Sequence, residues 1–248
     1  MSDSSYLKAL VLAGGRGKRL KEYTEDFNKA MLKFGDKHLI EYSLDNAVRL
    51  RVQEIIVVVG YMAEKIINAF GNSYKGIPLK YVIQQEQRGV VHAMECGREA
   101  IGESDFLLML ADEFFIQPEH VSFLHYFQKE QAFAICGVIY VDDLSRILKT
   151  YAVLCDAQSK QIFRLVEKPK NPMNNIMGTG NILMKNEIYD YIPATPINQQ
   201  RQEKELPDLI QCAIDDGKRV LYYPLAATYI NVNTPEDIVI LKEQQSLA

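Results

Sequence analysis

The stretch LAGGRGKRL, residues 12–20, decides which fold this chain can adopt. It follows an apolar run at residues 6–12, which predicts a short buried strand. Three glycines within four residues then form a turn whose backbone N–H groups can approach a ligand closely and hold phosphate oxygens. Arg16, Lys18 and Arg19 add positive charge beside the glycines. A strand, a glycine turn and a cationic exit together predict a phosphate-binding loop.

The spacing excludes two better-known glycine loops. The dinucleotide-binding motif requires G-x-G-x-x-G, but Leu20 stands where the third glycine would be. The P-loop requires Ser or Thr directly after its Gly-Lys pair, and Arg19 follows Lys18 in this chain. The loop is therefore neither of these two motifs.

Composition excludes several classes of partner. The chain has 248 residues and a formal net charge of −4, which argues against binding to nucleic acid. It contains no apolar run of the roughly 20 residues that span a membrane. The polar, acidic residues 1–5 do not form a secretory signal, so we expect a cytoplasmic protein. The four cysteines are scattered, which is typical of buried free thiols.

The first half of the chain alternates predicted strands with predicted helices. Such alternation is typical of a mostly parallel α/β sheet, in which ligands lie outside the carboxyl ends of the strands. That edge is where the glycine loop and Asp112 are expected. The strands after the first are expected at residues 54–59, 79–83 and 105–110, and the helices at residues 39–50, 62–70 and 90–101.

The second half is richer in strands. Because no full helices separate the first three of them, we expect antiparallel or mixed strands that extend the sheet. We find no repeat and no linker, so the prediction is a single α/β catalytic domain over residues 1–248. The strands are expected at residues 132–141, 151–155, 161–166, 179–184 and 219–224, and the helices at residues 204–216 and 235–244.

The loop, taken with the lysine that follows it, resembles a family signature. The pattern G-G-x-G-x-R-L followed by Lys29 resembles that of the sugar-1-phosphate nucleotidyltransferases. The resemblance implies a Rossmann-like three-layer fold, with Arg19 and Lys29 as catalytic residues acting on the phosphates of a nucleoside triphosphate. It also implies nucleotide-binding roles for the loop residues Leu12, Ala13, Gly14, Gly15 and Gly17.

Residues 84–93, QQEQRGVVHA, resemble the family's Q-x-x-x-x-G-[LT]-A-x-A segment. The resemblance implies that the Gln84 side chain and the Gly89 backbone read the edge of the nucleobase. An amide can both donate and accept hydrogen bonds, which suits this role. Taken alone, the segment could equally be a polar loop that caps a helix.

Two further segments resemble the metal-binding motifs of the family. Residues 110–113, LADE, resemble L-G-D-N, and residues 229–237 resemble W-x-D-[VT]-G-T-P-E-D. The resemblance implies that Asp112 holds Mg²⁺ and that Asn231 stands where the family has a second metal-binding aspartate. Glu113 could be another ligand or a solvated neighbour. Asn231 could instead only cap the turn that follows it.

Three segments resemble the sugar-binding part of the family. Residues 151–156 resemble Y-G-V-V-x-x-D, residues 167–169 match E-K-P, and residues 179–181 resemble the start of T-G-x-Y. The resemblance implies that Lys168 holds the sugar phosphate, and it implies sugar-binding roles for Ala152, Glu167, Gly180 and Asn181. Ala152 replaces a glycine, and from its extra methyl group we expect either a sugar that differs from glucose near the contacted hydroxyl or a slightly displaced sugar ring.

The six motifs occur in the family's order between about residues 10 and 241. The expected reaction joins a sugar 1-phosphate to a nucleoside triphosphate, UTP or dTTP by preference, and releases pyrophosphate with Mg²⁺ as cofactor. A GTP or CTP donor and a different phosphorylated acceptor are alternatives. So is a non-catalytic sensor of the same fold. Dimers are common among soluble enzymes, so a homo-oligomer is one alternative for the assembly state of this chain.

Overall fold

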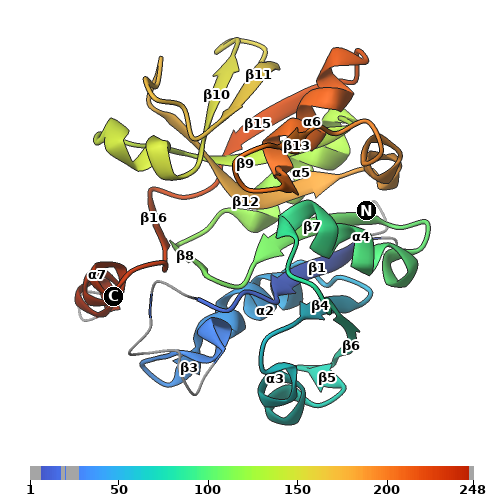
Figure 1. Cartoon of the computed structure of the whole chain (residues 1–248), viewed down its shortest axis with the longest axis vertical. Helices are drawn as coiled ribbons and strands as arrows, with labels where there is room; N and C mark the ends of the chain where they lie inside the picture. The colour runs from blue at the N-terminus through green and yellow to red at the C-terminus, as the bar shows by residue number, and fades with distance from the viewer. Residues whose placement is uncertain (1–6, 18–19, 21–27, 246–248) are drawn as a thin grey trace.

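A ten-stranded sheet forms the centre of the molecule (Figure 1). The computed structural model describes residues 7–17, 20 and 28–245. Along the main path the strand order is β11-β10-β12-β7-β1-β4-β6-β5, and β9 joins β12 to β15. The middle of the path is parallel, as predicted. It consists of β7 (Asp105–Leu110), β1 (Leu7–Ala13), β4 (Ile55–Val59) and β6 (Ile77–Ile83).

Helices cover both faces of this parallel region. Every residue of β4 is buried, because successive side chains of the strand point into different cores. Val57 packs in the cluster that contains Leu44 of α2 (Leu39–Arg49), whereas Val58 packs in the cluster that contains Met94 of α4 (Gly89–Ile101). Two cores separated by one sheet make three layers, so the predicted Rossmann-like α/β fold is confirmed.

The second half extends the sheet with mostly antiparallel strands, also as predicted. Strand β12 (Ile176–Met184) is antiparallel to β7, β9 and β10, so it connects the two halves of the molecule. Figure 1 shows β10 and β11 at one end of the molecule and β5 with α3 at the other. The antiparallel set is completed by β9 (Ala134–Tyr140), β10 (Tyr151–Cys155) and β11 (Ile162–Glu167), while β15 (Val220–Pro224) pairs with β9 in parallel.

A small ribbon brings the end of the chain back to its beginning. Strands β8 (Glu113–Ile116) and β16 (Thr228–Asn231) form an antiparallel pair that the sequence did not predict. Helix α7 (Pro235–Gln245) follows β16 directly. Ile238 of α7 shares a buried cluster with Phe34 and Leu39, near the start of the chain. The ribbon therefore holds Asp112 and Asn231 at the same edge of the sheet as the glycine loop.

One predicted helix begins later than expected. The sequence predicted residues 204–216, but α6 is Leu206–Asp215, with Pro207 in its first turn. Proline favours the first helical positions because its backbone has no N–H to pair. Lys204 belongs instead to a short hairpin of β13 (Ile197–Asn198) and β14 (Glu203–Lys204), here called the strap (residues 197–205).

The remaining elements are short or lie on the surface. They are α3 (Ala63–Phe70), α5 (His120–Glu130), β2 (Lys33–Phe34), β3 (Lys37–His38), β5 (Ser73–Tyr74), and the 3-10 helices η3 (Lys29–Met31), η4 (Leu144–Lys149) and η5 (Asn186–Tyr191). In the described part of the chain, no helix has the length and apolar character needed to cross a membrane.

Candidate active site

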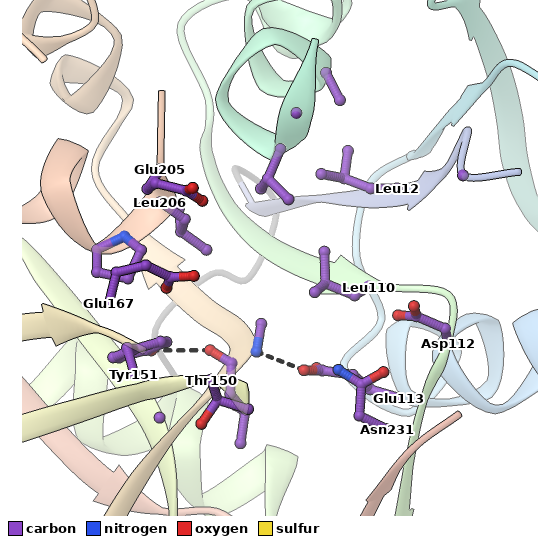
Figure 2. A pocket seen from close by; sticks show the side chains of 18 of the residues that line it. Leu12, Leu110, Asp112, Glu113, Thr150, Tyr151, Glu167, Glu205, Leu206 and Asn231 are labelled. Atoms are coloured by element: carbon purple, nitrogen blue, oxygen red, sulfur yellow. Dashed lines mark hydrogen bonds between the residues drawn. The ribbon is translucent and has the colours of Figure 1, made fainter. Parts of the chain in front are cut away.

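A cavity of about 500 Å³ opens at the carboxyl ends of the parallel strands, where the fold class predicts a ligand. Figure 2 shows that Leu12 and Leu110 lie on one side of it, and that Glu167 and Glu205 lie on the other. One side, here called the glycine wall, comprises Leu12, Gly14, Gly15, Gln84 and Gly89. The opposite side, here called the charged wall, comprises Glu167, Lys168, Arg201, Glu203 and Glu205.

The glycine loop is held by a buried asparagine. The Asn28 side chain donates hydrogen bonds to the carbonyl oxygens of Ala13, at 3.0 Å, and Tyr61, at 2.7 Å. Its oxygen accepts from the Ala30 backbone N–H at 2.9 Å and so starts the short helix η3. Gly17 has a φ of +63°, a conformation that favours glycine. Arg19, predicted to act on the triphosphate, lies outside the described residues, as does Lys18.

Close approach explains two glycines of the glycine wall. A Cβ atom on Gly14 would lie 2.9 Å from the Gln84 side-chain oxygen. Gly89 has a φ of +88°, and a Cβ atom there would lie only 2.5 Å from a carboxylate oxygen of Glu203. The strap therefore packs directly against Gly89, and the two walls meet at this point.

A chain of polar contacts joins the predicted metal ligands to Lys29. The Lys29 amine forms an ion pair with Asp112 and donates to the Asn233 side-chain oxygen at 3.1 Å. Asn233 in turn donates to the Asn231 side-chain oxygen at 2.6 Å. Asp112 and Asn231 both line the cavity. The structure therefore brings together one carboxylate and one amide oxygen at the wall of the cavity, with the Lys29 ammonium group buried beside them.

Glu113 is not the solvated neighbour that the sequence offered as one alternative. Its side chain is buried and accepts hydrogen bonds of 2.7 Å from the Gly180 backbone N–H, the Tyr229 hydroxyl and the Asn181 amide. Burial raises the pKa of Glu113 from its ordinary 4.5 to about 7, although the Tyr229 and Gly180 donors act in the opposite direction. Figure 2 shows Glu113 beside Asn231, below Asp112. Glu113 therefore ties the β8–β16 ribbon to β12 at the wall of the cavity.

Two residues predicted to bind sugar point away from the cavity. Tyr151 lines the cavity, whereas the next residue, Ala152, is buried in the hydrophobic core. Gly180 lines the cavity, whereas the Asn181 amide is engaged by Glu113 and, at 2.8 Å, by buried His120. Alternation along a strand explains Ala152, since its side chain faces the opposite side of the sheet from Tyr151, whereas Asn181 lies where the pairing register of β12 shifts between Gly178 and Ile182.

The charged wall gathers three carboxylates around one guanidinium group. Arg201 Nη1 lies 3.2 Å from Glu167 Oε1, 2.8 Å from Glu205 Oε1 and 4.0 Å from Glu203 Oε1. Lys168 Nζ lies 2.9 Å from the same oxygen of Glu167. Burial, together with the negative charge of Glu167, raises the pKa of Glu205 from its ordinary 4.5 to about 7.

Sequence reasoning identified only part of this wall. Glu167 and Lys168 belong to a motif, but Arg201, Glu203 and Glu205 stand in the polar run NQQRQEKE, residues 198–205. Alternating charges of this kind are typical of a solvated surface. Arg201 is flanked by two glutamines, and no motif in this run marks it as part of a binding site.

Comparisons with known proteins identify the family of this chain. The family model described as "Nucleotidyl transferase" matches residues 8–241. The UTP–glucose-1-phosphate uridylyltransferase AglF of Haloferax volcanii is 31% identical over 241 residues, which cover 93% of this chain and 93% of that protein. A glucose-1-phosphate thymidylyltransferase of Streptomyces griseus is 29% identical over 216 residues, which cover 86% of this chain and 59% of that protein.

Solved structures share the fold. A UDP-glucose pyrophosphorylase complexed with UDP-glucose superposes with a TM-score of 0.87 at 22% identity, covering 97% of this chain and 98% of the other. A UTP-bound UGPase from Acinetobacter baumannii superposes with a TM-score of 0.84 at 21% identity, covering 97% and 93%. The chain therefore belongs to the nucleotidyl transferase family, and the predictions that it resembles the sugar-1-phosphate nucleotidyltransferases and is an enzyme of that kind are confirmed.

Proposed function

We propose that this enzyme transfers a uridylyl or thymidylyl group from UTP or dTTP to a sugar 1-phosphate, with glucose 1-phosphate as the first acceptor to test. The observation that carries the proposal is the continuity of the cavity. A single space runs from the phosphate-binding type of loop, past Asp112, to the cations Lys168 and Arg201. Such a space accommodates two anionic substrates end to end. The names of the uridylyltransferase and thymidylyltransferase relatives support the same donors and acceptor.

In the proposed reaction, a phosphate oxygen of the sugar 1-phosphate attacks the α-phosphorus of the triphosphate. The new P–O bond forms as the bond to the departing pyrophosphate breaks, so the protein supplies positioning and charge rather than a covalent group. Lys168 and Arg201 would orient the attacking phosphate from the charged wall. Lys29 would leave its ion pair with Asp112 and stabilise the negative charge that develops on the α-phosphate.

The proposed Mg²⁺ requirement fits the residues at the centre of the cavity. Asp112 and Asn231 offer a carboxylate and an amide oxygen, which are ligands that Mg²⁺ accepts. Within the described residues, no three His, Cys, Asp or Glu side chains are placed so that they could hold a metal ion together, so substrate oxygens would complete the coordination. When bound there, the ion would neutralise phosphate charge.

The test is a grid of four nucleoside triphosphates against several sugar 1-phosphates, scored by release of pyrophosphate. The proposal predicts the fastest release with UTP or dTTP and a sugar 1-phosphate, and no release after chelation of divalent cations by EDTA. Release of pyrophosphate with GTP or CTP, but not with UTP or dTTP, would refute the donor assignment. Tight nucleotide binding without pyrophosphate release from any pair would indicate the sensor alternative.

A further inference from the structure

The amide group of Gln84 is fixed by two contacts on one side. Gln84 follows β6 and is only 4% exposed. Its nitrogen Nε2 lies 3.2 Å from the carbonyl oxygen of Gly89 and 3.0 Å from Nδ1 of His92. Gly89 begins α4, and His92 lies one turn later on the same helix. Both hydrogens of the Gln84 amide are therefore directed toward α4.

The chemistry of these two partners determines the orientation of the amide. A backbone carbonyl can only accept a hydrogen bond, so the Gln84 nitrogen, rather than its oxygen, must face Gly89. The oxygen Oε1 then lies on the opposite side, next to Gly14 in the glycine wall. Within the described part of the chain, no group donates a hydrogen bond to Oε1. Gln84 therefore offers the cavity an acceptor and no donor.

We propose that His92 is a positioning residue that holds Gln84 in this orientation and thereby makes the enzyme select bases with an N–H group at the ring position that Gln84 reads. This inference rests on the proposed function, because it concerns the nucleotide of that reaction. Uracil and thymine carry an N3–H donor, whereas N3 of cytosine is an acceptor and would face Oε1 unfavourably. A mismatch that leaves buried polar groups unpaired is a strong source of selectivity.

The start of α4 supplies the complementary group. The first backbone N–H groups of a helix have no partner within it, and Gly89 and Val90 line the cavity. An acceptor from Gln84 beside donors from this helix matches an imide N–H and the carbonyl oxygen next to it. His92 sets the first half of this pattern, although it is not among the residues that line the cavity.

The other ring nitrogen of His92, Nε2, has a contact with Arg88 that competes with the contact to Gln84. Nη2 of Arg88 lies 2.9 Å from Nε2 of His92, and the Arg88 side chain is 63% exposed. A neutral imidazole accepts at only one nitrogen. Water can replace His92 as a partner of exposed Arg88, whereas the buried Gln84 amide has no such replacement. We therefore assign the acceptor to Nδ1, which faces Gln84.

The test measures the affinities of UTP and CTP by titration calorimetry, without sugar phosphate, for the wild type and for His92→Leu, His92→Asn and Arg88→Ala. His92→Leu should lower the preference for UTP over CTP about three- to tenfold, the effect of one net hydrogen bond. His92→Asn should restore most of the preference, because its amide oxygen can replace Nδ1 as the acceptor. Arg88→Ala should leave the preference unchanged.

A measurement on the ligand side requires no variant and therefore does not depend on folding. N3-methyl-UTP lacks the N3–H and should bind the wild type no better than CTP does. The inference is overturned if the wild type does not prefer UTP, if His92→Leu retains the preference, if His92→Asn fails to restore it, or if Arg88→Ala abolishes it. Failure of the proposed function would look different, because pyrophosphate release would be absent while UTP was still preferred in binding.

Discussion

The glycine wall consists largely of backbone and small residues, whereas the charged wall facing it consists of long ionic side chains. In the glycine wall, Gly14 and Gly89 let the chain approach a ligand or a neighbouring side chain closely. In the charged wall, Glu167, Lys168 and Arg201 neutralise one another in the absence of substrate. The glycine wall therefore has its shape before a ligand binds. The charged wall, in contrast, must exchange its internal ion pairs for contacts with the ligand.

The largest effect is expected at Lys29, which pairs with the cavity residue Asp112. Lys29→Ala should lower kcat by roughly 10²-fold or more, the usual cost of removing a group that stabilises charge in the transition state. Because Lys29 is buried and paired with Asp112, its removal should also lower the melting temperature, so kcat is measured at a temperature at which the variant is folded. Lys33→Ala, at an exposed lysine of β2, is the matched control. Turnover within a few-fold of the wild type in Lys29→Ala would remove Lys29 from the proposed mechanism.

A large effect on stability is expected where Glu113 connects the ribbon to β12. Glu113→Ala leaves the N–H of Gly180 and the hydroxyl of Tyr229 without their acceptor, and should lower the free energy of unfolding by about 2–3 kcal/mol. Tyr229→Phe removes only one of these hydrogen bonds and should cost about 1 kcal/mol. Urea denaturation measures both values. Equal losses in the two variants would mean that Glu113 does not act as a shared acceptor.

A smaller, selective effect is expected in the charged wall. Arg201→Ala should raise the KM for the sugar 1-phosphate about tenfold and leave the KM for the nucleotide unchanged, because one charge-assisted contact is lost on one side only. Arg201→Lys should recover part of the loss, since lysine retains the charge but not the forked geometry. Arg219→Ala is the control, because Arg219 pairs with Glu130 away from the cavity. Equal changes in both KM values would contradict the division of the cavity into two walls.

The smallest effect concerns the pH dependence of stability. The raised pKa of Glu205 means that the folded protein binds more protons than the unfolded chain between about pH 4.5 and 7. Its contribution to stability is therefore present below this window and is lost as the pH rises through it. In Glu205→Gln, the fall in melting temperature between pH 5 and 7.5 should be smaller than in the wild type. Glu64→Gln, at an exposed position of α3, should reproduce the wild-type slope.

Local patterns made the glycine wall and most of the fold predictable. The β-branched run of β4 and the glycine turn after β1 indicate their structures within a few residues of sequence. The β8–β16 ribbon was not predictable in the same way, because its strands are four residues each and lie more than 100 residues apart. The part that the strap plays in the cavity was not predictable for a similar reason. Arg201 and Glu167 are 34 residues apart in the sequence and form an ion pair only in the folded chain.

The sequence by itself determined the alternating α/β layers, the glycine turn after β1 and the membership of the family, and it predicted Lys29 and Asp112 as site residues. These features depend on short-range periodicity and on motifs that are contiguous in the chain. Only the tertiary structure decided that Glu113 is a buried acceptor, that Ala152 and Asn181 face away from the cavity, and that His92 orients Gln84. The physical reason is that side-chain direction and hydrogen-bond partners depend on contacts between distant segments, which no local pattern specifies.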